Sequence, residues 1–249
     1  MNSIFKKEGP LYRLLTSLLY YLVAIPILTI ICVLFLGFRV RGWDRLREIE
    51  DTGAVIACNH IHYLDCAFLA IFAMPRRPVF CTLEQNLQLP VIRYLIKWLG
   101  GVPIPQKIGA LRRFMDGTSD AASKGKLVVI YPEGELELYC DHLRPFRNGA
   151  FQTAVRANVP VLPCYITQEK PRGILGLLKQ KPCLVLNVGE LMYPQKSEAG
   201  ESEQGTMVLR AAVRNLRERV YCEMERLADR ELPSFGGEPE LDNECPEVV

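Results

Sequence analysis

The chain has 249 residues and a formal net charge of +2, because its 30 basic and 28 acidic side chains nearly balance. This balance gives no reason to expect nucleic acid as a partner, since nucleic-acid-binding domains usually carry clustered excess positive charge. The length allows one large domain or two small ones, since domains typically run about 100–200 residues.

The first predicted element is an apolar helix. No charged residue occurs from Leu14 to Phe38, and a helix of about 25 residues, roughly 37 Å long, can cross a bilayer core of about 30 Å. Pro26 either kinks a single membrane helix or divides the run into a re-entrant hairpin of two short helices. Basic residues flank the run on both sides, so charge gives no orientation and slightly favours the hairpin. The alternative, a buried core helix, would usually show a polar face.

From Arg41 onward, short apolar runs alternate with longer segments of helical spacing. The predicted strands are 53–59, 78–82, 101–105, 126–131, 160–166 and 182–189. The predicted helices lie near 64–74, 88–98, 108–123 and 148–157, and a last one at about 206–230. This alternation predicts an α/β fold with a layered, mostly parallel sheet flanked by helices. We expect a membrane-association segment over 1–40, a folded domain over 41–230 and a disordered acidic tail over 231–249.

The nine cysteines are scattered singly from Cys32 to Cys245, with no C-x-x-C pair. Their odd number and the apolar neighbours of residues such as Cys58 indicate buried thiols in a reducing compartment rather than disulfides or metal ligands. We therefore expect the protein to be membrane-associated, with its folded domain on the cytoplasmic face.

A histidine and an aspartate follow the predicted strand 53–59 in the segment Asn59-His60-Ile61-His62-Tyr63-Leu64-Asp65. His60 would lie just beyond the strand, and Asp65 in the first turn of the next helix, from which its carboxylate reaches back to the imidazole. Such a base takes a proton from a hydroxyl near neutral pH and contributes roughly 10²–10⁴-fold to rate. The plainer alternative is that His60 only caps the helix. His62 could join the pair in a metal site, but only three histidines exist and we expect none.

Three further blocks accompany the His-Asp pair. They are Pro132-Glu133-Gly134, Pro145-Phe146-Arg147-Asn148-Gly149-Ala150-Phe151 and Val159-Pro160-Val161-Leu162-Pro163. Together the four blocks resemble the glycerolipid acyltransferase family of lysophosphatidic acid and glycerophosphate acyltransferases, over about residues 39–190. The resemblance implies that a fatty acyl group passes from acyl-CoA or acyl-carrier protein to a lysophospholipid hydroxyl, without another cofactor. It points first to 1-acylglycerol 3-phosphate as acceptor, to phosphatidic acid as product and to the lipid bilayer as a partner.

The resemblance also implies a role for each candidate residue in the catalytic domain 41–230. His60 would be the general base, and Asp65 would fix its tautomer and stabilise the imidazolium. Glu133 and Gly134 would help to hold the acceptor's glycerol-phosphate head at the C-terminal edge of a strand, where open α/β sheets bind ligands. The other candidate substrate-binding residues are Asn59, Lys107, Arg144 and Arg147.

Two blocks depart from the family pattern. Glu135-Leu136 stands where the family commonly has Thr-Arg, and Gln106 or Lys107 where it usually has an arginine. Lysine lacks the bidentate fork of arginine, and an added carboxylate opposes a phosphate. A differently headed acceptor, such as an amino-acid lipid, and a catalytically silent lipid-binding membrane protein therefore stay open as alternatives. A serine esterase is excluded, because the chain has no Gly-x-Ser-x-Gly elbow.

Overall fold

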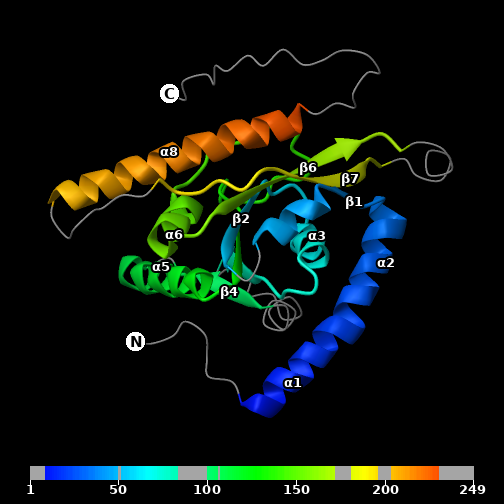
Figure 1. The fold of residues 1–249 in the computed structure, drawn as a ribbon. Helices are drawn as coiled ribbons and strands as arrows, with labels where there is room; N and C mark the ends of the chain where they lie inside the picture. Colours follow the sequence, from blue (N-terminus) through cyan, green and yellow to red (C-terminus); the bar gives the residue numbers. More distant parts are fainter. Residues whose placement is uncertain are drawn as a thin grey trace.

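The computed structural model describes residues 9–49, 52–83, 100–105, 107–171, 181–195 and 203–229. In this part of the chain a seven-stranded sheet lies between two layers of helices (Figure 1). The six predicted strands are observed as β2 (Ala54–Cys58), β3 (Val79–Leu83), β4 (Gly101–Ile104), β5 (Leu127–Ile130), β6 (Val161–Glu169) and β7 (Cys183–Val188). The strand order is β1-β7-β6-β2-β5-β3-β4. Only the β6–β7 pair is antiparallel, which confirms the predicted layered, mostly parallel sheet.

Two short elements were not expected from the sequence. Strand β1 (Arg39–Arg41) pairs in parallel with β7 at the edge of the sheet, with Val40 opposite Leu186. A 3₁₀ helix, η2 (Trp43–Ile49), follows it. A three-residue strand with two arginines has neither the length nor the apolar alternation that predicts a strand. Its pairing with β7 therefore depends on the rest of the sheet.

The helices form two layers because both faces of the central strands are apolar. In β2, Ile56 packs toward α3 (Asp65–Phe72) and α2 (Ile25–Leu36), whereas Val55 packs toward the opposite layer. That layer contains α5 (Ile108–Ser123), α6 (Gly149–Ala157) and α8 (Glu203–Ala228). Every residue of β2 is buried, as expected for a strand covered on both sides. The predicted helix 88–98 and the tail 231–249 lie outside the described residues.

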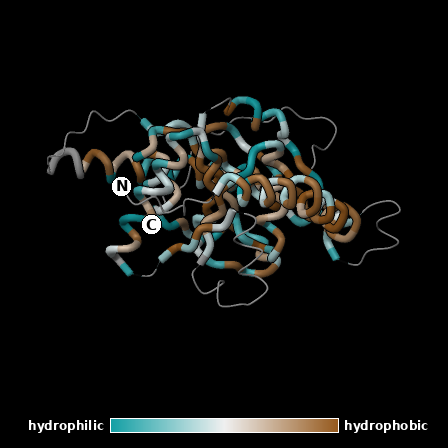
Figure 2. Tube along the Cα trace, turned by 90° about the horizontal axis from the view of Figure 1, so that it is seen from below, coloured by the Kyte–Doolittle hydropathy of each residue, from teal (hydrophilic) through white to brown (hydrophobic). Residues whose placement is uncertain are grey.

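The N-terminal apolar segment is one helix, and the favoured hairpin is wrong for the described residues. α1 (Pro10–Leu19), a π-helical turn (Tyr20–Ala24) and α2 continue without reversal at Pro26. The widened turn just before Pro26 accommodates the missing N–H and the ring, so the proline does not divide the helix. The helix is long and apolar enough to cross a membrane, although core helices and signal sequences can share these properties. Figure 2 shows it as a continuous hydrophobic segment.

The cysteines agree with the expectation of free thiols at seven of the described positions. Cys222 is disulfide-bonded, so the expectation is wrong at that position. Most of the free thiols are buried, and Cys58 and Cys164 lie opposite each other in the parallel β2–β6 pair. Burial raises the pKa of the Cys81 thiol to about 12. Such thiols act as small apolar core residues.

Candidate active site

The candidate catalytic residues lie at the C-terminal edge of the parallel strands. β2 leads to His60, and β5 leads to Glu133 and Gly134. β2 and β5 pair in parallel with Ala57 opposite Ile130, so the two loops leave the sheet side by side. Ligands of open α/β sheets bind at this edge.

His60 and Asp65 form the expected pair. His60 Nδ1 lies 2.9 Å from Asp65 Oδ2, and the same oxygen accepts the backbone N–H groups of Ile61 at 2.8 Å and His62 at 2.9 Å. Asp65 is fully buried in the first turn of α3. A carboxylate only accepts hydrogen bonds, so Nδ1 carries the proton and Nε2 has the free lone pair. The His60 side chain is 24% exposed, and Nε2 has no hydrogen bond within the described residues.

Tyr131 supports the imidazole from the side. Its ring stacks on that of His60, with centroids 4.0 Å apart and planes 14° from parallel. The Tyr131 hydroxyl is buried and has no hydrogen bond to any part of the chain that the structure describes. Burial raises the pKa of Tyr131 well above its usual range, so the hydroxyl stays protonated. Sequence reasoning missed this contact; an aromatic residue directly after a strand neighbouring that of His60 was the available signal.

Glu133 and Arg144, two of the expected substrate-binding residues, form a buried clamp between the catalytic loops. The Glu133 carboxylate accepts the backbone N–H of His60 at 3.1 Å and pairs with the Arg144 guanidinium. Arg144 also donates to the carbonyls of His60 at 3.3 Å and Glu135 at 2.7 Å. The side chains of Glu133 and Arg144 are 1% and 13% exposed. The clamp therefore fixes the loop after β5 to the loop that carries His60.

Asn59 is also internal rather than ligand-facing. Its side chain is fully buried, its Nδ2 donates to the Ile166 carbonyl at 3.1 Å, and its Oδ1 accepts the Ile166 N–H at 2.7 Å. Both ends of the amide are thus used to bind the neighbouring strand β6. Asn59 holds the start of the catalytic loop in place, and the expected substrate contact does not fit its position.

Of the exposed candidate cations, Arg147 lies against the loop that follows β5. It is exposed, and within the described residues its side chain has neither an ion pair nor a hydrogen bond. It lies against Gly134, where a Cβ would stand 2.5 Å from Arg147 Nε. Lys107 is exposed at the start of α5, after β4. Since β3 lies between β4 and β5, the loop that carries Lys107 does not leave the sheet beside the β5 loop.

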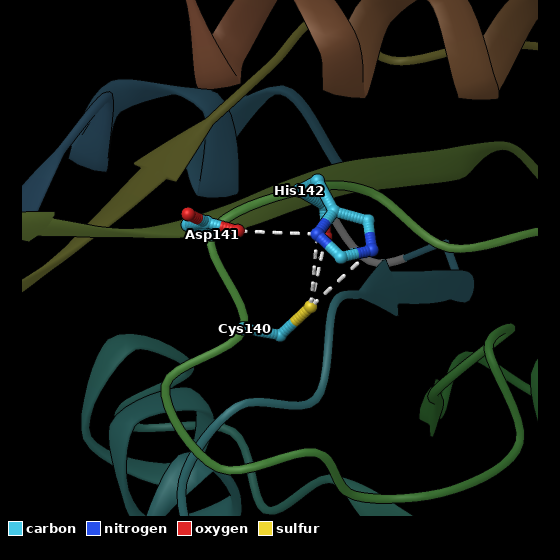
Figure 3. Close-up of side chains that lie close together, drawn as sticks. All are labelled: Cys140, Asp141 and His142. Carbon is cyan, nitrogen blue, oxygen red and sulfur yellow. Dashed lines mark hydrogen bonds and ion pairs between the residues drawn. The ribbon is translucent and has the colours of Figure 1, made fainter.

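A second polar group lies in the loop that follows Glu133. Cys140 Sγ is 3.6 Å from His142 Nδ1, which is 3.1 Å from Asp141 Oδ1 (Figure 3). Among the described residues, these three form a group close enough to hold a metal ion, and it includes neither His60 nor Asp65. Asp141 and His142 are exposed, and their mutual hydrogen bond lowers the pKa of Asp141. The hydrogen bonds among these three residues explain why they lie close together. His62, the histidine considered above for a metal site with His60, is not part of this group. Its Nδ1 accepts the Leu64 N–H at 3.1 Å.

Comparison with known proteins gives consistent matches. A family model described as Acyltransferase matches residues 37–167, slightly more than half of the chain. The chain is 36% identical over 131 residues to the human 1-acyl-sn-glycerol-3-phosphate acyltransferase beta, covering 51% of this chain and 45% of that protein. It is 26% identical over 167 residues to the chloroplastic 1-acyl-sn-glycerol-3-phosphate acyltransferase BAT2 of Brassica napus, covering 64% and 46%. The chain thus spans less than half the length of these curated relatives.

One solved structure shows the same fold. The crystal structure of the 1-acyl-sn-glycerophosphate acyltransferase PlsC from Thermotoga maritima matches with a TM-score of 0.51 and 18% sequence identity. The match covers 89% of this chain and 98% of that one. At this identity the likeness concerns the arrangement of the sheet and helices, and the roles of individual residues must come from the geometry above.

Proposed function

This chain belongs to the acyltransferase family, and we propose that it is a membrane-associated O-acyltransferase acting on a lysophospholipid. The donor would be a fatty acyl thioester of CoA or of acyl-carrier protein. The acceptor would be 1-acylglycerol 3-phosphate, the substrate named for its relatives, and the product phosphatidic acid. The observation that carries this proposal is the 2.9 Å contact between His60 Nδ1 and Asp65 Oδ2 at the ligand-binding edge of the sheet.

The reaction needs a base and no covalent intermediate. The acceptor hydroxyl gives its proton to His60 Nε2 as its oxygen attacks the thioester carbonyl carbon. Asp65 stabilises the imidazolium through Nδ1–H. The tetrahedral intermediate then collapses, the C–S bond breaks, and the leaving thiolate takes the proton from Nε2. Because a thioester is already activated, the base and the alignment of the two substrates supply the chemistry.

Arg147 is the residue that we propose for the acceptor phosphate. It is exposed, free of an acidic partner in the described part of the chain, and in contact with Gly134 beside the catalytic loop. Its fork can bind two phosphate oxygens at once, and α6 begins two residues later without a side-chain cap on its N-terminus. Arg147 can thus compensate for the arginines that the other blocks lack. Glu135, exposed next to Gly134, is the feature that favours a differently headed acceptor.

The apolar helix would keep this site at the bilayer surface, where the acceptor and product partition. Large apolar side chains are exposed along its length, including Leu11, Leu22, Leu34 and Phe35. Of the four arginines that follow it, Arg41 and Arg45 pair with glutamates, so Arg39 and Arg47 remain to attract anionic lipid at about 1 kcal/mol each. The division into a membrane segment 1–40 and a catalytic domain 41–230 on the cytoplasmic face is part of this proposal.

Thiol release from a long-chain acyl thioester tests the proposal. The detergent-solubilised protein is given acyl-CoA or acyl-carrier protein with lysophosphatidic acid, glycerol 3-phosphate, lysophosphatidylcholine or a lysine-headed lysolipid in parallel. His60→Ala is the test variant, and His142→Ala, which changes an exposed histidine in the same way, is the matched control. The proposal is supported if thiol is released in the presence of lysophosphatidic acid and this release is lost in His60→Ala but kept in His142→Ala. Release only with another acceptor changes the substrate, and no release with any acceptor favours the silent lipid-binding protein.

A further inference from the structure

A cavity of about 560 Å³ lies between α6 and α8, away from the His60–Asp65 pair. One wall follows a single face of α6, where the lining residues recur every four positions, and the other is a broad face of α8 from Met207 to Arg217. The polar lining residues are Asn148, Gln152, Arg156, Arg210, Arg214 and Arg217. The buried side chain of Val213, with Leu209, gives the cavity an apolar floor. We call it the α6–α8 groove.

The α6–α8 groove is positively charged. Arg156 pairs with Asp116 at 3.1 Å, and Arg217 donates to Asn148 Oδ1 at 3.1 Å. Arg210 and Arg214 are exposed, and neither forms an ion pair within the part of the chain that the structure describes. Four of the described residues that line the cavity are arginines, and none of them is an aspartate or a glutamate. Concave surfaces of one sign concentrate ligands of the opposite sign.

We propose that the α6–α8 groove binds the 3′-phosphoadenosine diphosphate end of an acyl-CoA donor; this inference rests on the proposed acyltransferase function. The volume falls in the range of small-molecule sites, about 300–1,000 Å³. Arginine binds phosphate oxygens bidentately and stacks on flat aromatic rings, so the two free arginines suit the phosphates and the adenine. An acidic carrier protein would instead need a broad surface of about 800 Å². The concave groove between two helices therefore favours the nucleotide over a carrier protein.

A series of contacts connects the groove to the catalytic base. Asn148 lines the groove, and its neighbour Arg147 lies against Gly134. The adjacent Glu133 accepts the backbone N–H of His60 at 3.1 Å. A pantetheine arm that crosses the start of α6 would bring the thioester sulfur toward His60.

The two layers of helices also separate the two ends of the donor. The apolar helix packs with α3 on one face of the sheet, and α6 and α8 cover the other (Figure 1). If the apolar helix contacts the bilayer, the α6–α8 groove lies on the aqueous side. The water-soluble nucleotide would then enter from water, while the acyl chain and the acceptor approach from the lipid side.

The test compares Arg210→Gln/Arg214→Gln with the charge-matched control Lys124→Gln/Arg219→Gln, whose residues are exposed and do not line the groove. The full chain is assayed in detergent with acyl-CoA and with acyl-pantetheine, which lacks the nucleotide. CoA binding is measured separately by calorimetry, since binding needs no turnover. We expect the groove variant to raise KM for acyl-CoA and Kd for CoA about tenfold or more, with kcat and KM for acyl-pantetheine unchanged.

Equal KM and Kd values for the groove variant and the control would overturn the inference while leaving the acyltransferase function intact. If only acyl-carrier protein serves as donor and the wild type does not bind CoA, the inference is also wrong. If no donor is used at all, the proposed function fails, and the calorimetry still decides the groove. CoA binding that is lost only in the groove variant supports the site, and binding that is unchanged or absent in all proteins contradicts it.

Discussion

The guanidinium of Arg147 lies directly against the backbone of Gly134, where an added Cβ would stand 2.5 Å from Arg147 Nε. Gly134 has a φ of +86°, in the left-handed region that side-chain-bearing residues avoid. Glycine is therefore required at this position for two reasons, the conformation of the turn and the close approach of the Arg147 guanidinium. Since the adjacent Glu133 holds the His60 backbone, the same short loop links the proposed phosphate site to the base.

Replacement of Gly134 by alanine should weaken both the turn and acceptor binding. The left-handed conformation costs about 1–2 kcal/mol for a residue with a Cβ, and Arg147 must move away. We expect a lower melting temperature and a higher KM for lysophosphatidic acid. Gly109→Ala is the control, because a Cβ at Gly109 in α5 meets nothing within 4 Å. Wild-type stability and KM in Gly134→Ala would contradict the proposed arrangement.

Replacement of Arg147 by alanine should affect the acceptor and leave stability unchanged. Hydrogen bonds to charged groups contribute about 1.5–3 kcal/mol, so KM for lysophosphatidic acid should rise roughly 10–100-fold. The KM for a monoacylglycerol, which lacks the phosphate, should stay the same. Arg147→Lys should recover part of the loss, since lysine keeps the charge without the fork. An equal effect on both acceptors would remove Arg147 from the phosphate site.

Replacement of Arg144 by alanine should destabilise the fold. It leaves the Glu133 carboxylate, whose side chain is 1% exposed, without its cationic partner, and a broken buried pair costs about 3–5 kcal/mol. The control is Arg45→Ala, whose partners Glu48 and Glu190 are exposed and whose loss should cost about 1 kcal/mol or less. Urea unfolding measures the loss of stability in the two variants. Equal midpoints for the two variants would show that the clamp does not stabilise the site.

The buried thiols should resist alkylation in the native protein. Burial raises the pKa of Cys81 to about 12 and raises the pKa of Cys58 well above its usual range. Because only the thiolate reacts, and a raised pKa keeps the thiol protonated until the pH approaches that value, iodoacetamide should label both slowly at pH 8 and faster as pH rises. Mass spectrometry of native and urea-unfolded protein measures the labelling. Equal rates in the two states at pH 8 would contradict the burial.

Asp65→Asn should lower kcat severely while the protein stays folded. The amide keeps an oxygen that can accept the backbone N–H groups of Ile61 and His62. Because an amide can also donate a hydrogen bond, it no longer selects the His60 tautomer that is protonated at Nδ1. Loss of the correct tautomer in a comparable triad lowers kcat about 10⁴-fold. Steady-state kinetics measures kcat, and circular dichroism shows whether the protein is folded. A rate within twofold of the wild type would mean that Asp65 does not orient the base.

The central strands and the His60–Asp65 pair were predictable because they depend on local patterns. Apolar runs bounded by turn residues indicate buried strands, and the five-residue spacing lets a carboxylate in the first helical turn reach the imidazole. β1 was not predictable, since its pairing with β7 comes from the sheet and not from its own arginine-rich sequence. The continuity of the apolar helix was missed because Pro26 suggests a break, which the π-helical turn avoids.

The roles of the polar site residues could not be separated from the sequence. Arg144 and Arg147 are three residues apart, yet one is held by Glu133 and the other is exposed. Asn59 adjoins the base but faces Ile166 on a strand more than 100 residues away in sequence. The direction in which each side chain points depends on long-range pairing of the strands. The α6–α8 groove, formed by two helices distant in the chain, was hidden for the same reason.

The most direct test of the whole account is acyl-CoA thiol release with lysophosphatidic acid by the wild type, His60→Ala and His142→Ala. We expect equal rates for the wild type and His142→Ala, and a loss of at least roughly 10²-fold in His60→Ala, with all three proteins folded. Release by His60→Ala at the wild-type rate would show that His60 is not the base and would contradict the proposed mechanism.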